Sequence, residues 1–169
     1  MNKKAVVWSI LIMVAAGFTA CAQEEEEEEI MGEVHVSVMF MNYTSMKEDA
    51  TMVMAYAWDS SNWSSGPSGS PASNAADGMF MGKTLNPNAP DTLSGTEEVH
   101  LGDLPKGTYY VGVFETSQMA YDASDAHLIG YYDENDDNMI TMDAATATGV
   151  AITQSGDVEL ETMMAMGGM

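Results

Sequence analysis

Residues 99–113, Val-His-Leu-Gly-Asp-Leu-Pro-Lys-Gly-Thr-Tyr-Tyr-Val-Gly-Val, carry the strongest fold signal in the chain. Pro105 presets the backbone for a turn, and Gly107 permits the positive φ that a tight turn requires. Beyond the turn, apolar side chains recur at every second position, as in a strand with one buried face, and they are Tyr109, Val111 and Val113. The stretch therefore predicts two strands joined by a tight turn.

Short strand patterns continue on both sides of this stretch. Residues 33–41 alternate in the same way, with Val34, Val36, Val38 and Phe40 on one face. The further strand-like segments are 51–58, 79–85, 97–101, 108–114, 127–132, 148–153 and 157–163. Short strands separated by turn residues predict an all-β fold, a single antiparallel β-sandwich of about seven to eight strands over residues 33–163.

The pattern Leu-Pro-x-Gly-x-Tyr-x-Val over residues 104–111 resembles the central hairpin of transthyretin-like (prealbumin-like) sandwich domains. Carboxypeptidase regulatory-like modules of exported bacterial proteins belong to this group. The resemblance is strong over residues 99–113 and weaker over residues 127–163. It implies a noncatalytic domain that acts as a stalk, an adaptor or a binding surface, although a shared fold does not by itself determine function.

Residues 1–20 have the order of a secretory signal peptide. Two lysines precede an apolar run from Ala5 to Phe18, and the small residues Thr19 and Ala20 follow. The apolar run is 14 residues long, shorter than the roughly 20 residues that a membrane-spanning helix needs. We therefore expect this segment to direct export and to be removed.

Cys21, the single cysteine of the chain, directly follows this segment. Residues 18–21, Phe-Thr-Ala-Cys, resemble the lipobox of bacterial lipoproteins, although that family usually has Leu at the position of Phe18. The resemblance implies that Cys21 is acylated, becomes the first residue of the mature protein and holds it to a membrane. The alternative is ordinary cleavage before Gln23, at the Ala-x-Ala site of residues 20–22, which would discard the cysteine.

Six consecutive glutamates, Glu24–Glu29, follow the cysteine. A block of like charges repels itself, so residues 21–32 are expected to form a lipidated, acidic tether. Acidic residues at this position also resemble the export signal of surface lipoproteins in some Gram-negative lineages. The expected localisation is that of an exported outer-membrane or cell-surface lipoprotein, with a periplasmic or secreted protein as the alternative.

Charge and cysteine content exclude several classes of function. The chain has 26 Asp and Glu residues against five lysines and no arginine, a formal net charge of −21, which disfavours nucleic acid as a partner. One cysteine allows neither an intramolecular disulfide nor a zinc site built from several cysteines. Ser68 does not lie in a nucleophile-elbow motif, and His35, His100 and His127 have no recognisable base or zinc spacing, so we expect no enzyme activity.

The acidic segment 133–141 is the candidate calcium site. Its oxygen-bearing residues occur at alternate positions, as in a calcium loop of the EF-hand type. The candidate ligands are Asp133, Asn135, Asp137, the carbonyl of Met139, and Thr141. Asn138, which tolerates left-handed conformations, stands where such loops have glycine, and Ala144 stands where they have a bidentate acid. The alternative is a solvated acidic turn.

Methionine is unusually frequent, with 17 residues against seven leucines. Thioether sulfur is a soft ligand that selects Cu(I), and a Met-x-Met pair in a strand places two sulfurs on one face. The candidate copper ligands lie in and beside the Met/Gly-rich tail of residues 164–169, and they are Met163, Met164, Met166 and Met169. The alternative is that methionine replaces leucine in the core.

These features predict an exported, lipid-anchored β-sandwich protein with a noncatalytic binding or structural role at the cell envelope. No cofactor is required, and the expected ligand is an envelope protein or a glycan. Trp58, Trp63 and the tyrosine pairs either line a surface for such a ligand or pack in the core and at its rim. The alternative function is metal binding, of Cu(I) by methionine and histidine or of Ca²⁺ by residues 133–141.

Overall fold

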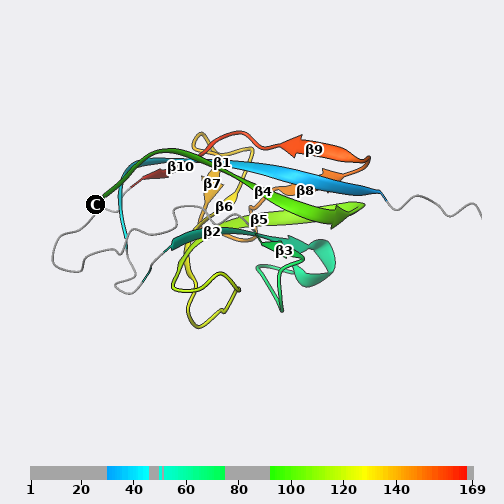
Figure 1. Cartoon of the computed structure of the whole chain (residues 1–169), viewed down its shortest axis with the longest axis horizontal. Helices are drawn as coiled ribbons and strands as arrows, with labels where there is room; N and C mark the ends of the chain where they lie inside the picture. Colours follow the sequence, from blue (N-terminus) through cyan, green and yellow to red (C-terminus); the bar gives the residue numbers. More distant parts are fainter. Residues whose placement is uncertain (1–29, 46–49, 51, 75–91, 167–169) are drawn as a thin grey trace, which may run out of the picture.

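Two β-sheets are stacked face to face in the computed structural model of the protein (Figure 1). The described residues are 30–45, 50, 52–74 and 92–166. The predicted signal peptide of residues 1–20, the lipidation site Cys21, the predicted strand 79–85 and Met169 lie outside them. The prediction of an all-β sandwich is confirmed for the described part of the chain.

Sheet A is built around β1 (Met31–Thr44). β4 (Thr92–Pro105) pairs antiparallel with one edge of β1. β9 (Gly156–Glu159) and β10 (Met163–Met166) pair parallel with its other edge. The expectation of a purely antiparallel sandwich is therefore wrong for this sheet. The last strands reach β1 after crossing over from sheet B, and a crossover connection permits the parallel direction that a tight hairpin forbids.

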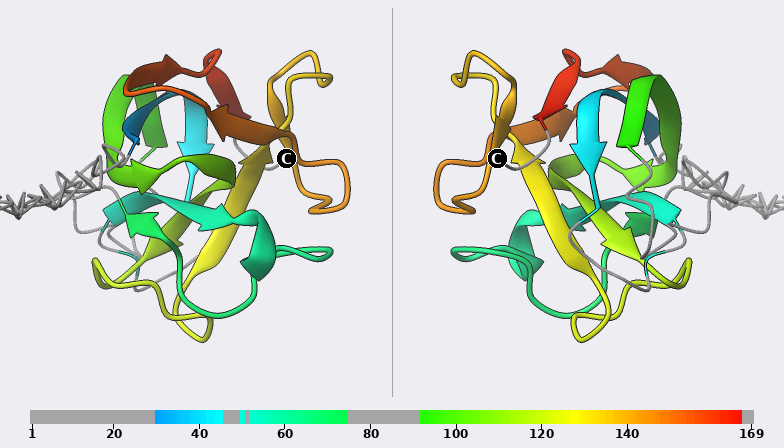
Figure 2. Two further views of the ribbon diagram at one scale, coloured as in Figure 1. Left: turned by 90° about the vertical axis from the view of Figure 1, so that its right-hand side faces the viewer. Right: turned by 90° about the vertical axis from the view of Figure 1, so that its left-hand side faces the viewer.

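Sheet B has β2 and β5 at its centre, and all of its pairings are antiparallel. Its strands in spatial order are β3 (Ser73–Asn74), β2 (Met52–Asp59), β5 (Gly107–Thr116), β6 (His127–Tyr132) and β7 (Ile140–Thr141), with β8 (Gly149–Ile152) pairing with the first half of β5. β8 and β6 both pair with β5, on the edge opposite to the one that β2 occupies (Figure 2).

The sandwich extends further than expected at both ends. β1 begins at Met31, so Met31 and Gly32 belong to the sheet and not to the tether. β10 includes Met164 and Met166, which the sequence placed in the tail. Both segments gain backbone hydrogen bonds from their neighbours in sheet A, and this pairing extends the folded domain beyond the predicted boundaries.

Alternate side chains of β1 fill the space between the sheets. Val34, Val36 and Val38 are completely buried, and burying each such side chain stabilises the fold by roughly 1.5–3 kcal/mol. A Cβ atom added to Gly32 would lie 2.7 Å from Cγ2 of Ile152 in β8. This face of β1 therefore packs directly against sheet B. The alternation predicted for residues 33–41 is therefore confirmed, and its odd-numbered side chains point away from sheet B.

The segment that predicts a hairpin instead connects the two sheets. β4 belongs to sheet A and β5 to sheet B, and Lys106 alone separates them in the chain. The Lys106 amide donates a hydrogen bond to the carbonyl of Ile30, 2.9 Å away, which ties this crossing to the start of β1. The predicted inward alternation after the turn is confirmed, because Tyr109, Val111 and Val113 are buried.

The conformation of this corner also differs from the prediction. Positive φ occurs at Asp103, at 56°, and not at Gly107. The Tyr109 hydroxyl donates a hydrogen bond to the carbonyl of Pro105, 2.6 Å away, across the crossing. A tyrosine hydroxyl bonded to a backbone carbonyl a few residues upstream is the arrangement called a tyrosine corner in other sandwich folds.

Aromatic side chains cover the face of sheet B that is turned away from sheet A. Tyr56 and Trp58 on β2 are fully buried beside Phe114 on β5. Trp63 from the loop after β2 and Tyr121 from the loop after β5 pack onto them, with ring centroids 6.1 and 5.0 Å from that of Trp58. These aromatic residues therefore form a second packing layer, in agreement with the core alternative.

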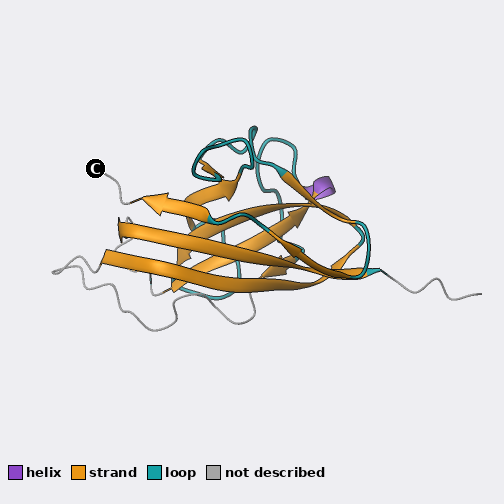
Figure 3. Cartoon of the chain, turned by 90° about the horizontal axis from the view of Figure 1, so that it is seen from above, coloured by secondary structure: helices purple, strands orange, loops and turns teal. Residues whose placement is uncertain are grey.

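The helical element among the described residues is η1 (Ser60–Asn62), a single 3-10 turn (Figure 3). Asp59 caps it by accepting hydrogen bonds from the amides of Ser61 and Asn62. These bonds, with that from the Ser61 hydroxyl as the largest contribution, hold the pKa of Asp59 below its ordinary value of 3.8. In the described part of the chain, no helix has the length and apolar character needed to cross a bilayer.

Candidate metal centre

Two histidines face each other on the outer surface of sheet A. The antiparallel register of β1 and β4 places His35 directly opposite His100. Their rings are stacked, with centroids 4.0 Å apart and planes at 10° to each other. Their chain neighbours Val34, Val36 and Val99 are buried, and because side chains alternate along a strand, both imidazoles point outward.

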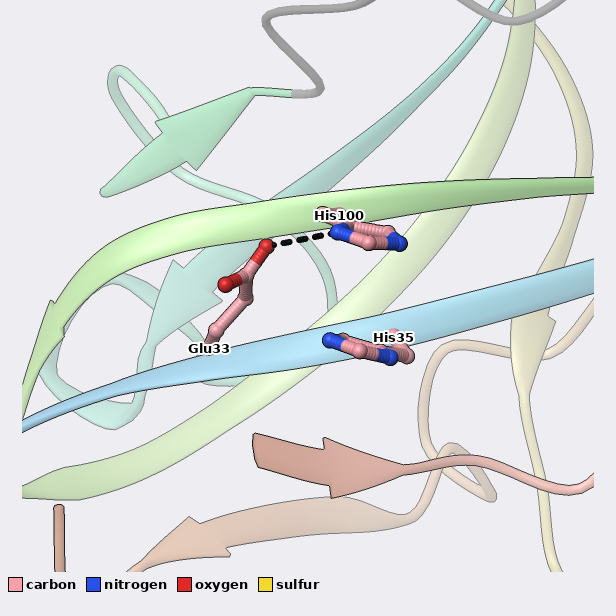
Figure 4. A group of neighbouring side chains, drawn as sticks. All are labelled: Glu33, His35 and His100. Carbon is pink, nitrogen blue, oxygen red and sulfur yellow. Dashed lines mark ion pairs between the residues drawn. The ribbon is translucent and has the colours of Figure 1, made fainter. Parts of the chain in front are cut away.

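Glu33 completes a three-residue cluster with this pair (Figure 4). It lies two positions before His35, on the same face of β1. One carboxylate oxygen of Glu33 is 2.9 Å from Nδ1 of His100. One ligand atom from each of the three residues can be chosen so that all lie within 4.8 Å of one another.

Two further carboxylates approach the cluster from β9. The parallel register pairs Asp157 with Glu33 and Glu159 with His35. A carboxylate oxygen of Asp157 lies 3.8 Å from Nε2 of His35, and one of Glu159 lies 3.7 Å from Nδ1 of the same ring. The His35 side chain is 26% exposed and that of Glu159 is 82% exposed. Two imidazoles and three carboxylates therefore gather where three strands of sheet A lie side by side.

This arrangement has the chemistry of a transition-metal site. Imidazole and carboxylate bind ions such as Zn²⁺ at about 2.0–2.2 Å, which places tetrahedral ligands about 3.4 Å apart. The three ligand atoms of the cluster lie within 4.8 Å of one another. The longest distance between them would therefore have to shorten by little more than about 1 Å. The stacked rings would also have to turn about their side-chain torsions, so that both nitrogen lone pairs point at one ion. Both imidazoles lie on the outer face of sheet A, where the side chain of His35 is 26% exposed and that of His100 is 48% exposed.

The ion pairs of this cluster contribute little to the stability of the fold. Exposed ion pairs contribute about 0–1 kcal/mol to stability, and a cross-strand side-chain pair adds about 0.2–1 kcal/mol. The chain could therefore lose these side chains without losing its fold. This independence makes the cluster suitable for testing by substitution.

The spacing of the three histidines along the chain gives no sign that two of them are neighbours in the fold. His35 and His100 are 65 positions apart in the chain, but strand pairing brings them together. The apolar alternation around each histidine already places both on outer faces. The missing information was which strands pair and in what register, because that depends on contacts distant in sequence.

The candidate calcium ligands form a hydrogen-bonded loop of their own. Asp133 is buried, and one of its oxygens accepts hydrogen bonds from the backbone and side-chain amides of Asn135. The Met139 carbonyl, the expected ligand at the seventh position, accepts the amide of Asp133. The left-handed residue is Met139, with φ of 54°, and not Asn138. Asp137 is exposed and the Thr141 hydroxyl lies 2.9 Å from that of Thr146, so calcium binding stays a prediction.

The candidate copper ligands are divided by the strand that carries them. Met163 is fully buried and faces sheet B. Met164 is partly exposed and Met166 is 57% exposed, because β10 alternates like any strand. Met163 therefore cannot join the other two at the surface, and the predicted set does not form one cluster. Met169 lies outside the described residues.

A second titratable group lies between the sheets, around Glu115 on β5. This carboxylate is fully buried, and one of its oxygens lies 3.8 Å from Nδ1 of His127. Tyr43 of β1 hydrogen-bonds to it from the opposite sheet. Burial first, and then the charge of Glu115, raise the pKa of Tyr43 well above its usual value. The side chain of His127 is 43% exposed, so it lies at the rim of this buried group, on sheet B and away from the two histidines of sheet A.

No protein-family model matches the chain, and neither a curated protein nor a solved structure matches it. The resemblance of residues 104–111 to transthyretin-like domains therefore stays a prediction. Function is inferred from the chemistry of the side chains themselves.

Proposed function

We propose that the protein binds a divalent transition-metal ion through Glu33, His35 and His100. The observation that supports this proposal is the placement of three ligand atoms within 4.8 Å of one another on the outer face of sheet A. Two imidazoles with one carboxylate form a ligand set suited to borderline ions such as Zn²⁺, Ni²⁺ and Cu²⁺. Asp157 and Glu159 are near enough to supply a fourth ligand or to orient the His35 ring.

The charge of the protein supports a cationic ligand. The net charge of −21 raises the local concentration of cations near the surface. A hard ion such as Ca²⁺ prefers six to eight oxygens, whereas the centre of this cluster is two ring nitrogens. The ligand set therefore favours a transition metal over calcium at this position.

Calorimetric titration of the full-length protein with Zn²⁺ and with Ni²⁺ tests the proposal. We expect wild type to bind and the variants His35→Gln and His100→Gln to lose most of the affinity, because each removes one imidazole ligand. The matched control is His127→Gln, which removes the third histidine, a partly exposed side chain on β6 of sheet B that is not part of the cluster. Binding that survives both sheet A variants, or that disappears only in the control, would exclude this site.

Export and a lipid anchor complete the proposed function. The order of residues 1–20, the cysteine at position 21 and the acidic run that follows support an exported lipoprotein at the outer membrane or cell surface. In this setting the domain has a noncatalytic binding or structural role, as its resemblance to transthyretin-like modules also implies. An envelope protein or a glycan remains the proposed macromolecular partner.

Substitution of Cys21 tests the anchor. We expect Cys21→Ser to move the protein from the membrane fraction to the soluble fraction of expressing cells, because a serine cannot receive the acyl chains. The measurement is cell fractionation followed by immunoblotting, with metabolic labelling by a fatty acid as a second readout. Unchanged membrane association together with absent labelling of wild type would remove the lipid anchor from the proposal.

A further inference from the structure

Three methionines line one hollow beside β10. Met142, Met164 and Met166 border this space, whose volume is about 370 Å³, together with Asp136 and Asn138 from the loop between β6 and β7. Met142 is 65% exposed and Met166 is 57% exposed. Its apolar walls come from Tyr43, Leu128, Ile129, Ile140 and Ala165. The hollow therefore combines several thioethers with one carboxylate at the surface.

The strand registers place two of these methionines beside two further methionines of β1. Met164 is paired with Met39 of β1, and Met166 with Met41. All four point outward because Val38 and Met163, one position earlier in each strand, are buried. Neighbouring strands lie about 4.8 Å apart, so two methionine pairs stand side by side at the end of the sheet. Met142, which follows β7 in the chain, lines the same hollow as Met164 and Met166.

Packing explains the buried methionines of this protein but not these. Met54 and Met163 are fully buried and contribute apolar surface to the core. A side chain that stays more than half exposed leaves most of its apolar surface in water and gains little by burial. Met142 and Met166 are in this position, and Met39 and Met41 are 38% and 49% exposed on the same surface.

We infer that Met142, Met164 and Met166 form a Cu(I) site. Thioether sulfur is a soft, uncharged ligand that selects Cu(I) over harder ions, and Asp136 adds a negative charge beside the hollow. This inference goes beyond the proposed function, because it assigns the protein a second site for a different ion. Met164 is paired with Met39, which is four residues from His35 on β1, or about 13 Å, so the thioether site and the histidine cluster are separate.

Anaerobic competition between the full-length protein and a chromophoric Cu(I) chelator tests the inference. We expect wild type to withdraw Cu(I) from the chelator and the triple variant Met142→Leu/Met164→Leu/Met166→Leu to lose this ability. Leucine keeps the apolar volume, so the fold is retained while the sulfur ligands are removed. The matched control is Met31→Leu/Met119→Leu, which removes two exposed methionines outside the hollow and is expected to bind Cu(I) like wild type.

Each outcome supports or overturns one claim. Wild type that takes no Cu(I), or a triple variant that binds like wild type, overturns the thioether site. Circular dichroism of the triple variant ensures that lost binding reflects lost ligands and not unfolding. Titration of the same variant with Zn²⁺ separates the two proposals, because the histidine cluster should bind as before. If His35→Gln and His100→Gln leave Zn²⁺ binding intact, only the proposed function fails.

Discussion

Tyr109 fixes the corner at which the chain leaves sheet A. Its hydroxyl lies 2.6 Å from the Pro105 carbonyl, and its side chain is 4% exposed. Burial first, and then the nearby charge of Asp59, raise the pKa of this phenol. We expect Tyr109→Phe to lower the free energy of unfolding by about 1 kcal/mol, because it removes one hydrogen bond and little apolar surface.

Urea unfolding followed by circular dichroism measures this loss. The matched control is Tyr110→Phe, because that neighbouring ring stacks on Trp63 with centroids 4.7 Å apart and needs no hydroxyl to do so. We expect the control to unfold close to wild type. Equal losses in the two variants would contradict a special role for the Tyr109 hydroxyl.

The residues around this corner show what the local sequence pattern can and cannot predict: it predicts which side chains are buried, but not which residue adopts the left-handed conformation. Alternation predicted the buried side of residues 33–41 and of Tyr109, Val111 and Val113 correctly. The same local reasoning assigned positive φ to Gly107, but Asp103 adopts it. A glycine permits a left-handed conformation without requiring it, and here the path between the two sheets determines where it is used.

At the scale of strands, Gly112 lets two aromatic rings close over β5. A Cβ atom at this position would lie 2.7 Å from Cε2 of Phe114 and 2.9 Å from Cδ1 of Tyr131. Both rings belong to the aromatic layer and are more than nine-tenths buried. We expect Gly112→Ala to destabilise the protein by roughly 1–3 kcal/mol, the range typical of an overpacked core.

Thermal and urea unfolding of Gly112→Ala test the packing of this layer. Gly102→Ala is the matched control, since nothing lies within 4 Å of a Cβ atom at Gly102 in β4. Its midpoint should stay close to that of wild type. A destabilised control with an unaffected Gly112 variant would show that backbone propensity, and not ring packing, determines the result.

Which strands pair with each other could not be predicted from the sequence. Residues 127–132 were predicted as a strand and form β6 with the same bounds. Residues 157–163 were predicted as one strand but divide into β9 and β10, which pair with different parts of β1. The predicted hairpin joins two different sheets. The histidine cluster depends on the β1–β4 register, so it could not be predicted from spacing along the chain.

At the scale of the whole molecule, β1 carries two residues of the histidine cluster and pairs with β10, which carries two of the proposed thioether ligands. Residues 22–30 would span at most about 30 Å from a lipidated Cys21. Glu33 and His35 lie near the start of β1, and Met164 and Met166 are paired with Met39 and Met41 in the second half of the same strand. An anchor at Cys21 would be closer along the chain to the histidine cluster than to the thioether site.

Buried tyrosines determine how the entire sandwich responds to alkaline pH. Burial, the largest cause in each case, raises the pKa of several phenols above the ordinary value of 10.0, and that of Tyr56 to about 12. These residues are Tyr43, Tyr56, Tyr109, Tyr121, Tyr131 and Tyr132. A raised pKa means that the folded state holds the proton more tightly than the unfolded chain. Their contribution to stability is therefore complete below pH 10 and is lost as the pH rises towards 12 and above.

We expect the free energy of unfolding to change little with tyrosine ionisation up to pH 10 and to fall steeply between pH 10 and 12. Urea unfolding at a series of pH values, with tyrosinate absorbance recorded in parallel, measures both quantities. Repulsion within a chain of net charge −21 also grows with pH, but high salt screens that repulsion, so a loss caused by buried phenols persists in high salt. Tyrosines that ionise near pH 10 while the β-sheet circular dichroism signal is retained would contradict this explanation. Such a result would mean that the aromatic layer on sheet B opens to water without unfolding of the sandwich.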